Sequence, residues 1–382
     1  MQLSDTADEA DYRRRLREWL GKTLPELPAP PDPSDWPGRR SYDTAWQRRL
    51  FDAGYAGIHW PKDAGGRGAS PSEHLIFLEE TERAGAPYVG ANFVGLLHAG
   101  PTIAAEGTPA QRSRFLPPIL RGDEIWCQGF SEPGAGSDLA ALRTRAVRDG
   151  DDYVVTGSKI WTSHAEVADW CELLVRTDPD APKHRGISWL AMRMDSPGVT
   201  VRPLRTLAGT TEFAELFLDE VRVPVANRVG EENDGWRVTM VTLSFERGTA
   251  FAGEAVACQR EVRELARVAR QNGAWDDLEL RRALATLAAE FTALWRLVQW
   301  NVSEAASRGV PGAGGSVFKL RFSESRQRLQ DLAARVVGAE ALVDGPWTAQ
   351  RLQGLSYTIA AGTSQIQRTI VAQRILGLPK GR

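Results

Sequence analysis

The sequence predicts an α+β protein in which a β-rich middle domain lies between two helical domains. Residues 1–122 carry apolar side chains at helical spacing, and Gly and Pro residues mark the breaks. From Ile125 onward the spacing changes to that of short strands, and from Gly235 it is helical again. No βαβ repeat occurs along the chain, so this order favours the α+β class over a doubly wound sheet.

The N-terminal domain, residues 1–122, is predicted to be all-helical. Apolar residues recur with the helical period, and a Pro-rich loop separates the first two segments. The expected helices are 8–20, 42–53, 72–84, 91–106 and 109–121. His59 and His98 fall in this domain, and we assign them no role because lone histidines are mostly structural.

The middle domain, residues 123–234, is predicted to be an antiparallel β domain, a barrel or a sandwich, and the barrel is our choice. Its segments are rich in β-branched and aromatic residues, and turn signals recur every ~8–12 residues, as is typical of all-β domains. The clearest strand segments are 152–161, 170–177, 186–194 and 214–221. The C-terminal domain, residues 235–382, is predicted to be a helical bundle with helices over 236–270, 277–308, 317–337 and 347–376.

Composition excludes several classes of function. The net charge of -2 and the pI near 6.3 argue against a nucleic-acid surface, which needs a basic face. No apolar run approaches the ~20 residues of a membrane span, and the acidic start MQLSDTADEADY is unlike a secretory signal. Cys127, Cys171 and Cys258 are widely spaced and odd in number, which indicates buried thiols rather than disulfides or a metal site. We therefore expect a cytoplasmic protein without a metal centre.

The most informative stretch contains two polar motifs, SEPGAGSD (131–138) and GSKIWTS (157–163). Glycines let a backbone approach a ligand closely, and a turn with free N–H groups suits an anion. In the second motif Trp161 stands beside the hydroxyls of Thr162 and Ser163, a combination that suits a flat heteroaromatic ring. No G-x-G-x-x-G follows a strand, which argues against a Rossmann site.

These two motifs resemble the flavin-binding signature of acyl-CoA dehydrogenases. The segment AAGTSQIQRTIVAQRILG (360–377) resembles the closing motif of that family, and VRVPVANRVGEENDGW (221–236) resembles its strand-to-helix crossing. The resemblance extends over nearly the whole chain. It implies FAD-dependent dehydrogenation of an acyl-CoA thioester to the trans-2-enoyl-CoA, with electrons passed to an electron-transfer flavoprotein.

The resemblance also implies which residues hold the cofactor and substrate. Gln128, Ser131 and Ser137 would line the isoalloxazine and the pyrophosphate, Trp161 would flank the ring, and Ser163 would reach toward its reactive nitrogen edge. The residues implied for FAD are Gln128, Phe130, Ser131, Gly136, Ser137, Trp161, Thr162, Ser163, Arg270, Thr363 and Gln365. Those implied for the acyl-CoA are Ser137, Arg247, Ala361 and Gly362.

The catalytic base is where this chain departs from most of the family. The family's usual glutamate precedes Gly-Thr in the closing motif, and here that position is Ala361, whose side chain cannot take a proton. Actinobacterial FadE-type members instead carry the base on the first long helix of the C-terminal domain. The matching segment LSFERGTAFAG offers Glu246, and helical spacing puts it on one stripe with the small residues Ala250 and Gly253. The resemblance therefore implies Glu246 as the base and Arg247 at the CoA end. The alternative to a catalytic role is that Glu246 forms an ion pair with a nearby Arg on a solvent-exposed face of the helix.

A second departure concerns contacts that the family makes across a subunit interface. The family presents Arg-x-x-Phe-Gly there, whereas this chain has Arg270-Gln271-Asn272-Gly273 without the aromatic residue. Where a Gln and a pair of Gly residues commonly hold the adenine end of the flavin in the family, this chain reads Arg335-Val336-Val337-Gly338-Ala339. Some members of the family form α2β2 hetero-oligomers in which two homologous chains complete one flavin site, and the loss of these contact residues with retention of the flavin-side motif fits such a chain. A homo-oligomer is the other assembly that the resemblance allows.

Two other functions remain open from the sequence. The same fold can use oxygen as acceptor, as acyl-CoA oxidases do, and steady hydrogen peroxide production would reveal that activity. Alternatively, the chain is a non-catalytic or half-site subunit that completes the site of a homologous partner. Ala361 favours that alternative and Glu246 opposes it.

Overall fold

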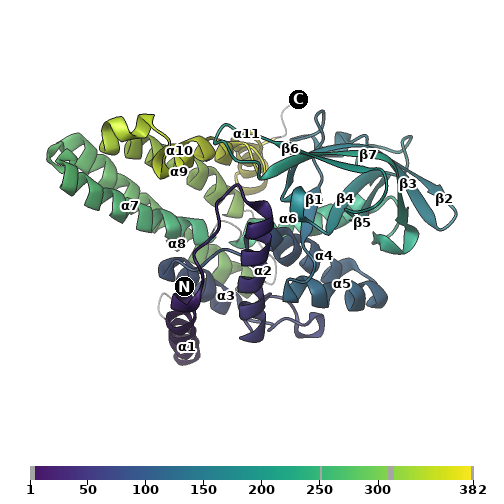
Figure 1. Cartoon of the computed structure of the whole chain (residues 1–382), viewed down its shortest axis with the longest axis horizontal. Helices are drawn as coiled ribbons and strands as arrows, with labels where there is room; N and C mark the ends of the chain where they lie inside the picture. Colours follow the sequence, from purple (N-terminus) through teal and green to yellow (C-terminus); the bar gives the residue numbers. More distant parts are fainter. Residues whose placement is uncertain (1–4, 250–251, 309–313, 380–382) are drawn as a thin grey trace.

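The structure is a computed structural model that describes residues 5–249, 252–308 and 314–379; the side chains of 245–249 and 305–308 lie outside the description. Helical N-terminal and C-terminal parts flank a β-rich middle part, so the predicted α+β class is confirmed (Figure 1). Buried cysteines are free at all three positions, Cys127, Cys171 and Cys258. Within the described residues, no helix is long and apolar enough to cross a membrane.

The N-terminal helices begin at well-defined caps. They are α1 (Ala7–Thr23), α2 (Trp36–Asp52), α3 (Pro71–Ala84), α4 (Gly100–Glu106) and α5 (Pro109–Arg121). The side chains of Thr6, Ser70 and Thr108 each accept a hydrogen bond from the backbone N–H three residues later. The Glu or Gln side chain at that later position accepts the backbone N–H of the Thr or Ser in turn. These reciprocal bonds satisfy donors that a helix start otherwise leaves free, which explains where α1, α3 and α5 begin.

The segment 91–106, expected to form one helix, is largely helical but not one regular α-helix. A 3₁₀ turn at Gly90–Asn92 and a π-helical turn at Gly95–Ala99 precede the short helix α4. Pro101 lacks the N–H that a regular helix needs at that position. At Gly100 an added Cβ would lie 2.1 Å from Cζ2 of Trp60, so the backbone here passes against a buried indole ring. Close packing on Trp60 and the missing donor together explain the irregular start of α4.

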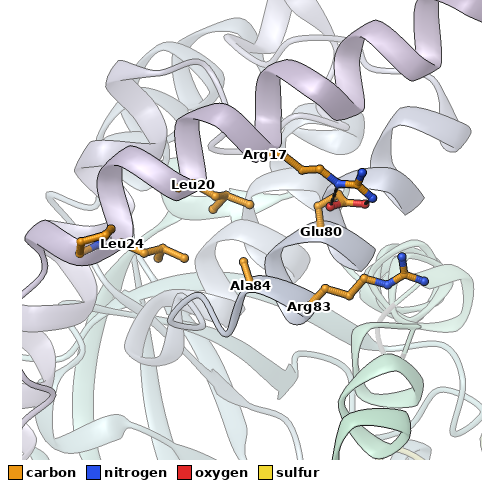
Figure 2. A pocket seen from close by; sticks show the side chains of 8 residues that line it. Arg17, Leu20, Leu24, Glu80, Arg83 and Ala84 are labelled. Carbon is orange, nitrogen blue, oxygen red and sulfur yellow. Dashed lines mark hydrogen bonds and ion pairs between the residues drawn. The ribbon is translucent and has the colours of Figure 1, made fainter.

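Helices α1 and α3 are joined by ion pairs beside an apolar groove (Figure 2). Arg17 of α1 donates two hydrogen bonds to Glu80 of α3, at 2.6 and 2.9 Å. Below this pair, Leu20 and Ala84 are among the residues that line the groove. Burial alone would raise the pKa of the Glu80 carboxyl, but the guanidinium groups of Arg17 and Arg13 hold that pKa below its usual value. The carboxylate is therefore ionised at neutral pH and fixes α1 on α3.

The middle part forms one sheet of eight strands in the order β6-β7-β3-β2-β4-β5-β8, with β1 beside β4. The strands are β1 (Trp126–Gly129), β2 (Arg145–Asp149), β3 (Asp152–Ser163), β4 (Trp170–Arg176), β5 (Ile187–Arg193), β6 (Val199–Leu204), β7 (Phe213–Pro224) and β8 (Arg228–Val229). Most neighbours are antiparallel, as expected. The pairing of β1 with β4 is parallel, and so is that of β2 with β4, which joins Arg145 to Arg176.

One face of the sheet packs on the N-terminal helices through a tryptophan stack. Trp126, Trp170 and Trp189 come from β1, β4 and β5, and the ring centroids of Trp126 lie 5.6 and 6.4 Å from the other two. Phe115 of α5 meets Trp126 and Trp170 edge-on at 5.4 and 5.0 Å. Edge-to-face and offset contacts of this kind stabilise a core beyond the area that they bury. The stack therefore fixes β1, which leads into the first polar motif, against α5.

The C-terminal part is a bundle built on long helices. It comprises α6 (Gly235–Thr249), α7 (Ala252–Asn272), α8 (Leu278–Arg308), α9 (Gly314–Val337), α10 (Pro346–Gly354) and α11 (Ser364–Ile370). Leu265, Phe291 and Phe322 are fully buried where α7, α8 and α9 pack together. Helix α6 lies centrally and packs against β5, α4 and α9, so it connects the three parts of the chain (Figure 1).

Candidate functional site

The first polar motif is a tight turn with an open surface. The backbone N–H groups of Glu132 and Ala135 each donate to the other residue's carbonyl oxygen, at 3.1 and 3.0 Å. Gly134, Gly136 and Ser137 are exposed at the tip. A Cβ added at either glycine would meet no atom within 4 Å. The tip therefore offers unobstructed backbone that a bound molecule can approach.

A buried ion pair anchors this turn to strand β3. Nζ of Lys159 lies 2.8 Å from Oε1 of Glu132 and also donates to the carbonyl oxygen of Phe130 at 3.2 Å. The side chain of Lys159 is 0% exposed and that of Glu132 is 9% exposed. The Glu132 carboxylate also accepts the backbone N–H groups of Arg143 and Thr144, at 2.7 and 2.8 Å. One carboxylate thus joins the turn, the start of β2 and the middle of β3.

The charges of this pair follow from its surroundings. Burial alone would raise the pKa of the Glu132 carboxyl, but the Lys159 ammonium and the hydrogen bonds from Thr144 hold it below its usual value. Burial lowers the pKa of Lys159, and Glu132 opposes that change. We infer an ionised pair at neutral pH, because the carboxylate has donors on both oxygens and the ammonium has acceptors for its protons.

The second polar motif is shaped by a β-bulge. Lys159 pairs with Leu216 and Thr162 with Ala214, so two residues of β3 face one residue of β7. Trp161, inside the bulge, has a φ of 61°, which is rare for a bulky residue. Trp161 is 57% exposed, and its one ring contact within the described residues is a T-shaped contact with Phe213, at 5.9 Å between centroids. The bulge therefore turns the indole out of the sheet toward solvent.

The structure brings the two motifs together. The backbone N–H of Ile160 donates to the carbonyl oxygen of Ser131 at 2.9 Å, so Ser131 lies beside the bulge that carries Trp161. Phe130 and Thr162 point into the interior, at 4% and 0% exposure. Oγ1 of Thr162 is buried and has no hydrogen-bond partner in the described part of the chain. Ser163 is half-buried at the end of β3.

Gln128 lies behind the turn and is oriented by a buried carboxylate. It faces Glu172 across the parallel β1·β4 pairing, and its Nε2 donates to Oε1 of Glu172 at 2.7 Å. Nδ1 of His98 lies 3.3 Å from the same Nε2. No sequence pattern predicts His98 at this position, because the irregular segment before α4 carries it to β1.

The closing motif forms a strained turn before α11. Ala361 has a φ of 50° and Gly362 a φ of 85°, and such a conformation costs an alanine about 1–2 kcal/mol. Nε2 of Gln367 donates to the carbonyl oxygens of both residues, at 3.2 and 3.4 Å. Thr363 caps α11 by accepting the N–H of Ile366 at 3.2 Å, and Gln365 is exposed. The turn is thus held from the side of its carbonyl groups.

The remaining predicted residues lie in the helical bundle. Arg270 is near the end of α7, where its guanidinium carbon lies 3.9 Å from the ring centroid of Trp275 and its Nη1 donates to the carbonyl oxygen of Ala266. Helix α7 packs on α3, α8 and α9. Glu246 and Arg247 fall within the range of α6, but their side chains lie outside the described residues.

Two residues that hold the site together, Lys159 and Glu132, were not predicted from the sequence. Lys159 and Glu132 lie inside the two motifs, and neither received a role. The strand pattern contained a signal for this ion pair. Residues of β3 alternate between the interior and the surface, and this alternation directs the charged side chain of Lys159 inward. A lysine that the strand period directs inward needs an acid partner, and Glu132 is available in the preceding turn.

Each of the three parts of the chain matches the model of a known domain. Domain models described as acyl-CoA dehydrogenase N-terminal, middle and C-terminal domains match residues 6–123, 127–221 and 233–376. Acyl-CoA dehydrogenase IpdE1 of Mycobacterium tuberculosis is 39% identical over 382 residues, which cover 98% of each chain. Acyl-CoA dehydrogenase FadE26 of the same organism is 37% identical and covers 100% of this chain and 99% of its own.

Two solved structures are also similar to this chain over its full length. The ChsE4-ChsE5 complex from Mycobacterium tuberculosis contains a chain that is 35% identical, with a TM-score of 0.84 and full coverage of both chains. The Tcur3481-Tcur3483 steroid ACAD contains one that is 33% identical, with a TM-score of 0.86 and full coverage of both.

We predict that the Lys159→Met substitution lowers the free energy of unfolding by about 3–5 kcal/mol, because it leaves the Glu132 carboxylate buried without its cation. The matched control is Lys183→Met. Lys183 pairs with Asp138 of the same turn, but the two side chains are 53% and 60% exposed, so the loss should stay below about 1 kcal/mol. Denaturant titration of both variants measures the difference. Equal and small losses would show that the buried pair does not hold the turn.

Proposed function

The chain belongs to the acyl-CoA dehydrogenase family, and from this premise we propose that it binds FAD and oxidises an acyl-CoA thioester to the trans-2-enoyl-CoA. The observation that carries the proposal is the buried Glu132–Lys159 pair, which joins the two motifs of the flavin signature on one surface. Members of the family are flavoproteins and oxidoreductases. The chemistry that this surface would support is therefore an oxidation by a bound flavin.

The residues present fit FAD. The open glycines of the turn and the hydroxyl of Ser137 suit a pyrophosphate, while the exposed ring of Trp161 suits the face of an isoalloxazine. Gln128, Phe130, Ser131, Gly136, Thr162 and Ser163 complete the proposed contacts from the same chain. Thr363, Gln365 and Arg270 are proposed to contribute to FAD as in the family. When bound, FAD accepts the hydride from the β carbon of the substrate.

We propose Glu246 as the base. A base must take the α proton of the thioester, and the methyl side chain of Ala361 offers no acceptor at the family's usual position. The backbone N–H of Ala361 is proposed to donate to the thioester carbonyl oxygen and so to stabilise the charge that develops there. Gly362 and Ser137 are proposed to contact the acyl-CoA beside it, and Arg247 its CoA end.

A second chain is part of this proposal. Arg270 rests on Trp275 of its own chain, and the bundle exposes large apolar residues, among them Leu342 at 86% and Leu376 at 63%. Such surfaces are typical of contacts with another protein. Two of the similar solved structures carry two protein names each, ChsE4-ChsE5 and Tcur3481-Tcur3483. We propose a homo-oligomer or, favoured by those names, an α2β2 hetero-oligomer with a homologous chain.

The proposed substrate and acceptor draw on the same relatives. The structure named a steroid ACAD favours a bulky acyl group such as a steroid side chain, and the small side chain of Ala361 leaves room for it. We propose an electron-transfer flavoprotein as acceptor and a cytoplasmic location.

If the enzyme uses oxygen instead, it will release hydrogen peroxide steadily in the presence of the thioester. If the chain is a half-site subunit, only the complex with its partner will react.

We predict that Trp161→Ala weakens FAD binding about 10-fold and changes stability little, because the ring is exposed and contributes mainly its face, which is worth about 0.5–1.5 kcal/mol. Trp300→Ala is the matched control, since Trp300 is 49% exposed on α8. Fluorescence titration of the apoprotein with FAD gives both dissociation constants. An unchanged dissociation constant for Trp161→Ala would remove the indole from the cofactor site.

The base is tested by Glu246→Gln, which keeps the shape of the side chain and removes the proton acceptor. We expect flavin and fold to be retained, and the rate of flavin reduction by acyl-CoA to fall by ~10²–10⁴-fold. Glu264→Gln, an exposed glutamate on α7, serves as control. Stopped-flow absorbance without oxygen measures each rate, and reduction of Glu246→Gln at the wild-type rate would place the base elsewhere. The double variant Glu246→Gln with Ala361→Glu should recover part of the rate if the added carboxylate fits the cavity.

The active form is predicted to exceed the 42.0 kDa of one chain. Where the isolated chain binds FAD poorly, co-expression with a homologous chain should restore binding, because the contacts that close the cofactor site come from the partner. Light scattering with simultaneous absorbance measures mass and flavin content together. A monomer that is fully loaded with FAD and active would refute the shared site.

A further inference from the structure

A buried lysine holds the turn that carries Ala361. Lys319 lies on α9 and is 5% exposed. Its Nζ donates to the carbonyl oxygen of Tyr357 at 2.6 Å and to that of Gly362 at 3.1 Å. These two carbonyl groups lie on either side of residues 358–361. A single ammonium group therefore fixes the length and direction of the segment that ends in the strained turn.

The contacts of Lys319 determine where the peptide groups of the turn point. Ala361 has a positive φ, which is unfavourable for an alanine, so its conformation depends on interactions with the surroundings. Gln367 binds the carbonyl oxygens of both residues, and Lys319 of α9 binds that of Gly362 as well. Among the backbone hydrogen bonds of the described residues, none has the N–H of Ala361 as its donor, so this N–H is available to a ligand.

We propose that Lys319 is a positioning residue for the dehydrogenation: by binding the carbonyl oxygens of Tyr357 and Gly362, it orients the turn so that the backbone N–H of Ala361 meets the thioester carbonyl oxygen. This inference rests on the proposed function. It gives α9 a part in the reaction although no side chain of α9 is proposed to touch the substrate.

Packing alone does not account for an ammonium group here. Phe318 and Phe322 stack beside Lys319 on α9, and the ring of Tyr357 meets Phe322 edge-on at 5.7 Å. An apolar side chain would fill this aromatic surrounding without the cost of burying a charge. Burial lowers the pKa of Lys319 to about 8, so the group keeps its full set of donors at neutral pH at some cost. The donors, and not the bulk of the side chain, are what the carbonyl groups require.

The chain offers a matched control on the same helix. Gln327 of α9 donates to the carbonyl oxygens of Gly354 and Leu355, both at 3.3 Å, and to Oγ1 of Thr358 at 3.1 Å. It thus anchors the beginning of the same irregular segment as Lys319 but lies away from Ala361. A purely structural role predicts similar effects of Lys319→Met and Gln327→Met. A positioning role predicts that only Lys319→Met changes the environment of the substrate carbonyl.

The test uses the flavin-loaded protein with its partner chain. The probe is the enoyl-CoA product of the thioester that bleaches the wild-type flavin fastest, labelled with carbon-13 at the thioester carbonyl. Infrared difference spectra report the stretching frequency of that carbonyl, which falls when it accepts strong hydrogen bonds. We expect wild type and Gln327→Met to lower the frequency equally, and Lys319→Met to lose most of this shift. Flavin reduction in Lys319→Met should slow by about 10²-fold, the effect of misplacing a reacting group by about an ångström.

Each outcome decides between the alternatives. If Lys319→Met keeps the wild-type carbonyl frequency and reduction rate, the positioning role is refuted while the proposed function stands. If Gln327→Met loses the shift equally, the effect is structural and the inference is also refuted. If no thioester bleaches the wild-type flavin, the proposed function itself fails. If Lys319→Met does not fold, Lys319→Gln replaces it, because its shorter neutral amide cannot reach both carbonyl groups, and the same loss of shift is expected.

Discussion

Between the Gly-rich turn and strand β3 stands one buried ion pair, and the geometry of the exposed site follows from it. Glu132 and Lys159 are 27 residues apart in sequence, and their contact fixes the turn on the strand that carries Trp161. A buried pair costs desolvation for both ions, which is recovered only when the remaining hydrogen-bonding positions are satisfied. Here the backbone of Arg143 and Thr144 satisfies the carboxylate, and the carbonyl group of Phe130 satisfies the ammonium.

The residues proposed for the reaction come from two parts of the chain, the β-sheet and the helical bundle. The sheet, packed through the tryptophan stack, presents the open turn and the indole for a flat cofactor. The bundle presents α6 with the proposed base and the Ala361 turn in front of α11. Helix α6, which carries the proposed base, packs against β5 of this sheet and against α4 and α9. Arg270 lies in the bundle, near the end of α7, and stacks on Trp275.

The fold class and the family could be predicted because each depends on local pattern: residue period, turn residues and contiguous signature motifs. Features set by tertiary contacts could not. The segment before α4 is irregular because Gly100 packs on the distant Trp60, and β1 pairs in parallel with β4, a strand distant from it in the sequence. The exposed indole of Trp161 depends on a bulge that only the register with β7 reveals. The tether from Lys319 to Gly362 joins residues 43 positions apart, which no local pattern reports.

The central claim is that this chain oxidises an acyl-CoA thioester through a flavin held at the Glu132–Lys159 surface. The most direct measurement is an oxygen-free titration of the purified, flavin-loaded complex with acyl-CoA thioesters, straight-chain, branched and steroid-bearing, while the visible flavin absorbance is recorded. We expect at least one thioester to bleach the flavin stoichiometrically and an electron acceptor to restore the colour. A correctly folded, flavin-loaded complex that keeps its absorbance with every thioester would contradict the claim.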